Sequence, residues 1–449
     1  VWGRHWDQLL EKDKSGLLIK RMNEVCDGEL QNYKYNGGAY TREHFFGKYP
    51  ELLELVKDMT DDQIMALNRG GHDPYKVYAA YAEASASKGK PTVILAQTVK
   101  GYGLGDAGEA ANDTHSVKKL DMDSLRKFRD RFGIPIPDDQ LETVPYYKPA
   151  EDSPELAYMK SRRQELGGPL PARKADFEPM TTPPLSAFKK QLESSGEREI
   201  STTMAFVRVL SSLVKDKNIG SRVVPIVPDE ARTFGMEGMF RQLGIYTSAG
   251  QKYVPHDHQQ IMYYKEDKKG VILEEGINEA GAMSAWLALA TSYSTNSCPM
   301  IPFYIFYSMF GFQRIGDLAW ASGDSQARGF LIGATAGRTT LNGEGLQHQD
   351  GHSLILANTI PNCKSYDATF SYELAVIVQD GVKRMFEDQE NCFYYLTTMN
   401  ENYTQPAMPV GVEEGIVKGM YKFSEAGKGD KKVTLMGAGT ILNEVIAAA

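Results

Sequence analysis

Short apolar runs rich in β-branched and aromatic residues alternate along the chain with longer segments of helical periodicity. Apolar runs of this length predict buried strands, and apolar positions three and four residues apart predict helices. The predicted strands are 92–99, 223–227, 300–305, 329–334, 391–397 and 433–436. The predicted helices are 6–26, 121–132, 201–215, 278–291, 316–327 and 371–386, with Asp121 as an N-cap. The alternation predicts an α/β fold in which parallel β-sheets are flanked by helices.

Proline-rich segments divide this pattern into units. We expect a first α/β unit at 1–171, a linker at 172–199, a second α/β unit at 200–405 and the start of a third unit at 406–449. The chain begins at Val1 without a Met, and its last helical pattern has no stop signal. We therefore expect an internal fragment of a longer polypeptide, with the first and last units truncated.

Composition narrows the class of protein. The 449 residues are 42% hydrophobic and 24% charged, with a formal net charge of −8, which is typical of a globular protein and argues against nucleic acid as the main partner. The four cysteines form no CxxC pair, so reduced thiols and a cytoplasmic protein are expected. No apolar run reaches the roughly 18–20 residues of a membrane span.

A glycine-rich segment matches a dinucleotide-binding motif but lacks its context. Gly103, Gly105 and Gly108 have GxGxxG spacing, yet the next good helix starts only near Asp121, whereas a dinucleotide site needs a helix that opens within the glycines. NAD binding is therefore rejected. The segment 101–119 is better interpreted as a long mobile loop with a functional role. His115 lies in it, and its residue context alone predicts a solvated side chain.

Acidic residues follow two predicted elements. Asp229 and Glu230 come directly after the strand 223–227, where parallel sheets bind ligands, although a solvated turn is an equal alternative. Glu279 falls in the first turn of a very apolar helix. A glutamate there can simply complement the helix dipole, but at the mouth of a buried helix it could hold or share a proton.

Aromatic and histidine residues follow in the next two segments. The aromatic run 303–312 includes Tyr307 and Phe310, and these rings could pack in the core or stack on a flat heterocycle. The loop 339–352 contains Glu344, His348 and His352. Its glycines disfavour the helix that a zinc site on the two histidines would need, so a loop that presents a histidine for proton transfer is the better interpretation.

Taken together, these segments resemble the thiamine-diphosphate enzymes of the transketolase-like group, and within it the pyruvate dehydrogenase E1 components of the bacterial homodimeric type. The resemblance runs over essentially the whole chain. Its most specific stretches are 42–50 (REHFFGKYP), 68–74 (NRGGHDP), 99–103 (VKGYG), 229–236 (DEARTFGM), 304–314 (YIFYSMFGFQR) and 340–348 (TLNGEGLQH). It implies a pyrimidine-binding domain at 200–405 and the C-terminal part of a diphosphate-binding domain before it.

The resemblance also implies roles for the residues of the second unit. Glu279 would hydrogen-bond the aminopyrimidine ring of thiamine diphosphate, with Ile277 among the cofactor contacts. Phe310 would stack on that ring, with Tyr307 nearby. His348, together with Glu344, would lie at the active-site entrance.

The resemblance implies further roles for residues after the predicted strand 223–227 and for residues of the first unit. Asp229 and Glu230 would be active-site acids beside the cofactor. Lys100 would be a cofactor contact. His115 would act on the substrate and in reductive acetylation of the lipoyl group, which reverses the interpretation from its residue context alone.

The implied activity is oxidative decarboxylation of pyruvate with transfer of the acetyl unit to lipoyllysine on the acetyltransferase (E2), in a homodimer that binds thiamine diphosphate and Mg²⁺. The family's Gly-Asp-Gly metal motif is absent from the sequence, so the metal ligands are expected before Val1. Alternatives are another thiamine-dependent 2-oxo acid dehydrogenase, a transketolase, or a non-catalytic fragment that dimerises or binds E2.

Overall fold

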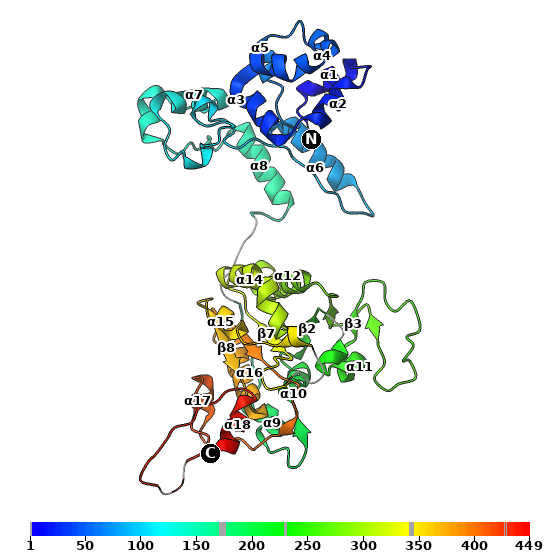
Figure 1. Ribbon diagram of the computed structural model, residues 1–449, viewed down its shortest axis with the longest axis vertical. Coiled ribbons are helices and arrows are strands. Elements are labelled where there is room, and N and C mark those ends of the chain that lie inside the picture. The colour runs from blue at the N-terminus through cyan, green and yellow to red at the C-terminus, as the bar shows by residue number, and fades with distance from the viewer. Residues whose placement is uncertain (1, 170–176, 229–230, 341–344, 426, 428) are drawn as a thin grey trace. The chain divides into compact units, whose positions relative to one another are not determined.

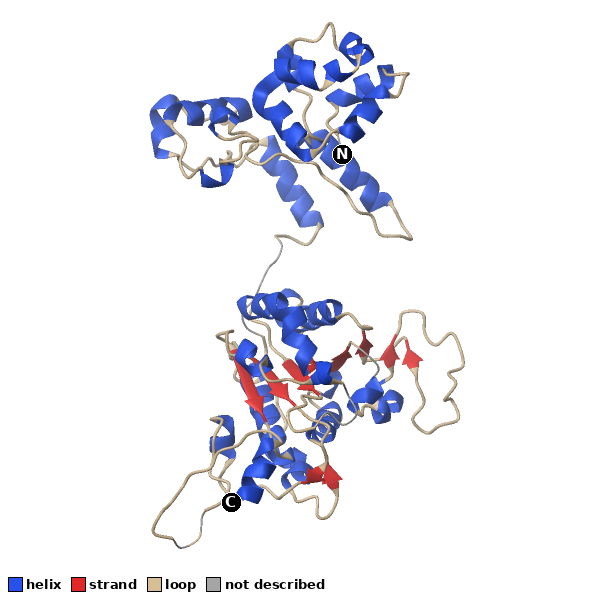
Figure 2. Cartoon of the chain, in the orientation of Figure 1, coloured by secondary structure: helices blue, strands red, loops and turns tan. Residues whose placement is uncertain are grey.

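The computed structural model describes residues 2–169, 177–228, 231–340, 345–425, 427 and 429–449. The chain divides into two compact units, Val1–Leu166 and Gly167–Ala449 (Figure 1). The first unit consists of helices joined by loops, and the second contains the β-sheet (Figure 2).

The first unit is held together by an aromatic core. Its helices are α1 (His5–Lys12), α2 (Leu17–Glu24), α3 (Asp27–His44), α4 (Pro50–Leu55), α5 (Asp61–Met65), α6 (Pro74–Ala86), α7 (Met122–Phe132) and α8 (Pro154–Glu165). Trp6 packs edge-on against Phe45 and nearly parallel to Phe46, and all three side chains are buried. Burial of such rings is the main source of stability for a small helical unit.

Two predictions for this unit are wrong. The segment 92–99 forms no strand, and the side chains of Val93 and Leu95 are 81% and 77% exposed. A β-rich segment becomes a strand only where another backbone pairs with it, and the sequence pattern does not supply that partner.

The helix predicted at 6–26 is instead two helices. The Asp13 carboxylate accepts hydrogen bonds from the backbone N–H groups of Ser15 and Leu18, at 3.1 and 2.8 Å. Gly16 has φ +74°, which places it in the left-handed region and turns the chain. Local hydrogen bonding by a short polar side chain therefore outweighs the helical periodicity.

The second unit contains a six-stranded parallel sheet in the order β5-β2-β6-β7-β9-β8. The strands are β2 (Val223–Val227), β5 (Leu273–Glu274), β6 (Ile301–Tyr307), β7 (Phe330–Ala334), β8 (Cys363–Asp367) and β9 (Phe393–Thr397). The central strands are buried on both faces, which explains their continuous apolar runs. The predicted fold class, a parallel sheet flanked by helices, is confirmed.

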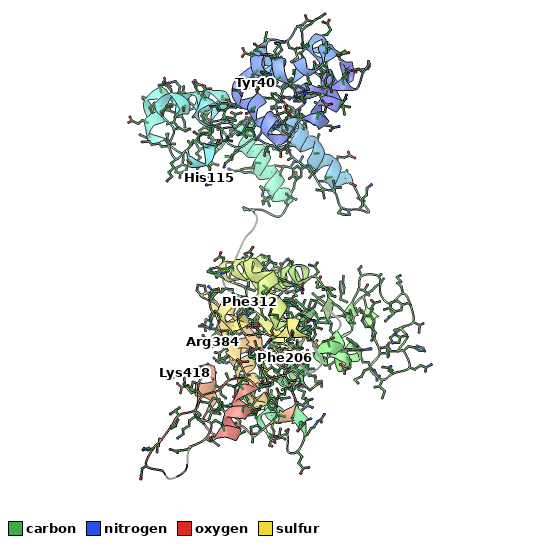
Figure 3. The ribbon with its side chains drawn as sticks, in the orientation of Figure 1. Tyr40, His115, Phe206, Phe312, Arg384 and Lys418 are labelled. Atoms are coloured by element: carbon green, nitrogen blue, oxygen red, sulfur yellow. The ribbon has the colours of Figure 1, made fainter. Side chains whose placement is uncertain are left out.

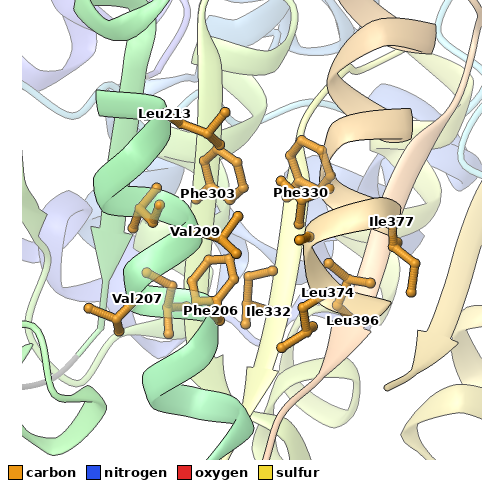
Figure 4. Packing of buried hydrophobic residues seen from close by; sticks show 14 of the residues in the cluster. Phe206, Val207, Val209, Leu213, Phe303, Phe330, Ile332, Leu374, Ile377 and Leu396 are labelled. Atoms are coloured by element: carbon orange, nitrogen blue, oxygen red, sulfur yellow. The ribbon is translucent and has the colours of Figure 1, made fainter. Parts of the chain in front are cut away.

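Helices cover both faces of the sheet. On one face, α10 (Thr202–Val214) and α16 (Ser371–Phe386) enclose a core in which Phe303 and Phe330 stack with ring centroids 4.5 Å apart (Figure 4). On the other face, α12 (Glu279–Ala290), α14 (Ser308–Asp324) and α15 (Ser353–Ala357) pack around the buried Trp286. The remaining elements are α9 (Lys189–Leu192), α11 (Phe240–Leu243), α13 (Ser292–Thr295), α17 (Glu413–Val417), α18 (Ile441–Ala448), and the short strand pairs β1 (Glu199–Ile200) with β10 (Tyr403–Thr404) and β3 (Ile245–Tyr246) with β4 (Glu266–Asp267).

Two further predictions for the second unit differ from the structure. The helix predicted at 316–327 begins eight residues earlier, at Ser308. Gly311 permits this start, because a Cβ there would lie 1.9 Å from the Phe306 ring. The segment 433–436 forms no strand, and the side chains of Val433 and Met436 are 78% and 73% exposed. As at 92–99, the β-rich pattern lacks a partner strand among the described residues.

Candidate active site

The carboxyl ends of the parallel strands bring several predicted site residues to one edge of the sheet. Val227 is paired with Glu274, and Tyr307 with Ala334, so β2, β5, β6 and β7 end together. Helix α12 begins shortly after β5, and α14 follows β6 directly. Open parallel sheets bind ligands at this edge.

Glu279 is the first residue of α12, as the sequence predicts. Asn278 caps the helix through a 3.0 Å hydrogen bond that its side chain accepts from the backbone N–H of Gly281. The Glu279 carboxylate forms an ion pair with Arg314 of α14. The carboxyl side chain is 11% exposed and the guanidinium side chain 46%, so the acid lies inside and the cation faces solvent.

Tyr304 lies on β6 close to this pair. Its side chain is fully buried, and its hydroxyl has no hydrogen-bond partner among the described residues. Burial and the nearby charge of Glu279 raise the pKa of this hydroxyl, so it stays protonated. A protonated hydroxyl without an acceptor is a donor available beside the Glu279 carboxylate.

Tyr307, Phe310 and His348 form an aromatic cluster at the same edge. The His348 ring packs edge-on against Tyr307 and Phe310, with centroids 4.8 and 5.2 Å apart. Arg314 lies over the Phe310 ring at 4.5 Å. A flat ring face next to a carboxylate can bind a heterocycle that needs both stacking and a hydrogen-bond acceptor.

The structure places the other predicted residues of this unit as follows. Ile277 precedes α12 with a side chain that is 79% exposed. His352 shares a 3.0 Å hydrogen bond with Gln313 of α14 and does not pair with His348 on a helix. Asp229, Glu230 and Glu344 lie outside the described residues.

Lys100 and His115 belong to the first unit. Both side chains are exposed, and His115 lies on a short turn at Thr114–Ser116 (labelled in Figure 3). The placement of these two residues in the same site as Glu279 stays a prediction, as does the mobility of the loop 101–119.

The loop that contains His115 is built around a buried carboxylate. Glu109 is 6% exposed and accepts hydrogen bonds from the backbone N–H groups of Gly103 and Gly105, at 3.0 and 3.3 Å. Arg131 of α7 and Lys34 of α3 pair with the same carboxylate. The glycines of the rejected dinucleotide motif therefore surround a side chain of the protein itself, and the first α-helix after them starts at Met122.

The Glu109 cluster predicts a pH-dependent stability of the first unit. Burial alone would raise the pKa of Glu109, but Arg131 and Lys34 lower it from 4.5 to about 2. Because the folded-state pKa lies below the unfolded value, the stabilisation is present above pH 4.5 and lost as the pH falls towards 2. Glu109→Gln is expected to destabilise the unit by about 1–3 kcal/mol at pH 7.

Calorimetric unfolding from pH 7 to pH 2 tests this expectation. The difference between wild type and Glu109→Gln should shrink as the pH falls. Asp106→Asn is a matched control, because Asp106 lies in the same loop and pairs with Lys127 but is 93% exposed. A difference that does not depend on pH would contradict the assignment.

Residues that sequence reasoning missed are Arg314 and Asp350. Arg314 ends the stretch 304–314 without a role assigned from the sequence, and the early start of α14 brings it opposite Glu279. Asp350 lies within the loop 339–352 without a role assigned from the sequence, and it is the buried anchor of that loop. The sequence carried no signal for the Glu279–Arg314 contact, since the two residues lie 35 positions apart.

The described part of the chain contains no candidate metal site. Within it, no group of three or more His, Cys, Asp or Glu side chains could hold a metal ion. Likewise, none of its helices is long and apolar enough to cross a membrane.

Comparison with known proteins decides the family. Residues 183–406 match the model of the pyruvate dehydrogenase E1 component middle domain, and residues 60–148 match that of the transketolase thiamine diphosphate binding domain. Proteins named pyruvate dehydrogenase E1 component from Pseudomonas aeruginosa and Escherichia coli are 66% and 60% identical to the chain, over 454 and 451 residues. The chain belongs to the pyruvate dehydrogenase E1 family. Both alignments cover the whole chain, whereas the chain spans about half the length of each relative, 51%.

A solved structure supports the fold of the chain. A transketolase variant from Pichia stipitis aligns with a TM-score of 0.50 at 15% identity, over 89% of this chain and 55% of the transketolase. At this identity the likeness shows the transketolase-like fold alone.

Proposed function

We propose that the chain forms part of a pyruvate dehydrogenase E1 component that decarboxylates pyruvate and passes the acetyl unit to a lipoyl group on E2. The identity of 66% to a protein of that name supports the proposal most strongly. The carboxylate and aromatic cluster at the sheet edge is consistent with it, because these side chains suit the cofactor of such an enzyme.

The described residues fit an aminopyrimidine group such as that of thiamine diphosphate. Glu279 offers an acceptor or a proton to a ring nitrogen, and Phe310 offers a ring face for stacking. Tyr304 has a buried hydroxyl without a partner among the described residues. Ile277 adds an exposed apolar contact. These four residues would hold the pyrimidine half of the cofactor.

When bound, thiamine diphosphate supplies the electron sink that a 2-oxo acid needs to lose carbon dioxide. The chain's own contribution is to position groups and to move protons. Glu279 would hold or share a proton at its carboxyl oxygen, and the Arg314 guanidinium would orient that carboxylate. His348 would present its ring at the entrance beside Tyr307.

Further elements of the proposal come from the family. Asp229, Glu230 and Lys100 would be additional cofactor contacts. Mg²⁺ would bind the diphosphate through ligands outside this chain. The working enzyme would be a cytoplasmic homodimer that contacts E2, and the loop 101–119 would help to exclude water from the reaction.

His115 gives a prediction that separates the two half-reactions. In the full-length protein, His115→Ala is expected to lower acetyl transfer to a lipoyl domain by roughly 10²-fold or more, because proton transfer by a positioned side chain contributes that much. Pyruvate decarboxylation measured with an artificial electron acceptor should fall much less. Ser116→Ala, an exposed neighbour on the same turn, is the control. Equal losses in both assays would contradict a transfer role.

The substrate proposal is tested with a full-length protein supplied with thiamine diphosphate and Mg²⁺. Carbon dioxide release is measured with pyruvate and with 2-oxoglutarate, and ketol transfer with a ketose phosphate. Pyruvate should be turned over and the other two substrates should not. A preference for 2-oxoglutarate would indicate a different 2-oxo acid dehydrogenase, and ketol transfer would indicate a transketolase.

A further inference from the structure

Asp350 is a buried carboxylate two residues after His348. It is 1% exposed and precedes the short helix α15. Its Oδ1 accepts hydrogen bonds from the backbone N–H groups of His352 and Ser353, at 3.1 and 3.0 Å. One oxygen of the carboxylate therefore holds the backbone at the residues that follow the turn with His348.

The other oxygen of Asp350 connects the turn to the sheet. Oδ2 accepts a hydrogen bond from the Ser353 hydroxyl, which in turn accepts one from the hydroxyl of Tyr395 at 2.8 Å. Tyr395 is a fully buried residue of β9. Arg338, which follows β7, lies 3.8 Å from the same carboxylate and donates to Asp367 at 2.6 Å. The chain of contacts spans three strands.

The hydrogen bonds that link Asp350, Ser353 and Tyr395 lie next to the start of α14. A Cβ at Gly333 of β7 would come within 2.3 Å of the Tyr395 hydroxyl oxygen and 2.8 Å of the Ser308 Cβ. The glycine thus lets Ser308, the first residue of α14, approach Tyr395. Burial alone would raise the pKa of Asp350, but hydrogen bonds from Ser353 and His352 lower it, so the group stays charged.

The turn that precedes Asp350 is held at both ends. The backbone N–H of Asp350 donates to the carbonyl of Gly337 at 3.3 Å, and that of His348 donates to Gly345 at 3.0 Å. Between these contacts the His348 ring meets Tyr307 and Phe310. His348 and the buried Asp350 therefore belong to one turn, two residues apart.

We propose that Asp350 is a positioning residue: through Ser353 and Tyr395 it fixes the turn that carries His348 against the first turn of α14. The kinetic consequence rests on the proposed function, whereas the structural consequence does not. The alternative is that Asp350 only caps α15, in which case its removal would loosen the helix without moving the histidine ring.

The first experiment uses this chain and no catalytic assay. Asp350→Asn keeps the size of the side chain and removes its charge. In protein labelled with ¹³C at histidine, the His348 ring signals are expected to shift, and amide exchange at 345–353 to rise by about 10-fold or more while exchange in α16 stays unchanged. Asp324→Asn, at an exposed position near the end of α14, is the matched control. Unshifted His348 signals would overturn the proposal.

The second experiment is a double-mutant cycle in the full-length enzyme. Asp350→Asn is expected to lower kcat by about 10-fold or more, with a much smaller change in KM, because a misplaced group costs rate more than binding. If Asp350 acts through His348, the variant that combines it with His348→Ala should be no slower than His348→Ala alone. Additive losses would overturn the proposal. A wild-type protein inactive on pyruvate would contradict the proposed function instead, and the ring signals would still decide the role of Asp350.

Discussion

Glu279→Gln in the full-length protein is expected to reduce kcat for pyruvate by roughly 10²–10⁴-fold, the contribution of a positioned proton-transfer group. Glutamine keeps the length and shape of the side chain, but it cannot hold a proton for exchange with a ring nitrogen. It also removes the charge that pairs with Arg314. Steady-state turnover of pyruvate with thiamine diphosphate and Mg²⁺ measures the effect.

Glu275→Gln is the matched control for this variant. Glu275 lies four residues before Glu279 on the same segment, and its side chain is exposed. Its replacement should change kcat by less than about threefold, as expected for a surface substitution away from the chemistry. Unchanged activity in Glu279→Gln would refute the role that is proposed for this carboxylate.

Trp286→Ala is expected to destabilise the second unit by about 3–5 kcal/mol, the usual cost of truncating a fully buried Trp. Trp286 is 0% exposed on α12, packs edge-on against Phe393, and donates from its ring nitrogen to the carbonyl of Phe330 at 3.0 Å. For a unit of this size, the loss corresponds to a fall in Tm of roughly 10 °C. Differential scanning calorimetry of the chain would show it in the transition of the second unit.

The sequence offers a control with the same substitution. Trp320 lies on α14 in the same unit, but its side chain is 47% exposed. Trp320→Ala should stay within about 0.5 kcal/mol of wild type, as for most surface changes. Equal shifts in Tm for the two variants would show that Trp286 is not part of the core that positions α12.

Much of the second unit could be predicted because its signals are local. The strand at Val223–Val227 and the helix at Ser371–Phe386 have the predicted bounds. Both could be predicted from the sequence. A short apolar run is typical of a buried parallel strand, and the helix has apolar residues along most of its length because most of it is buried. Prediction failed where a strand depends on pairing with another strand. The β-rich segments 92–99 and 433–436 have the composition of strands but form no hydrogen-bonded strand pair.

The candidate site was predictable in part. Glu279, Tyr307, Phe310 and His348 meet at one edge because parallel strands end together. The contacts that hold them were not predictable, because Arg314 meets Glu279 only once α14 starts at Ser308. These contacts depend on where a helix begins and on how a turn folds back, which residue periodicity does not encode.

The activity proposed for the enzyme to which this chain would belong is the conversion of pyruvate into an acetyl group on a lipoyl carrier. The most direct measurement is mass spectrometry of a lipoylated E2 domain after incubation with the full-length protein, pyruvate, thiamine diphosphate and Mg²⁺. We expect one acetyl group on the reduced lipoyl arm, dependent on pyruvate and lost in Glu279→Gln. An unmodified lipoyl domain, or modification that persists in Glu279→Gln, would contradict it.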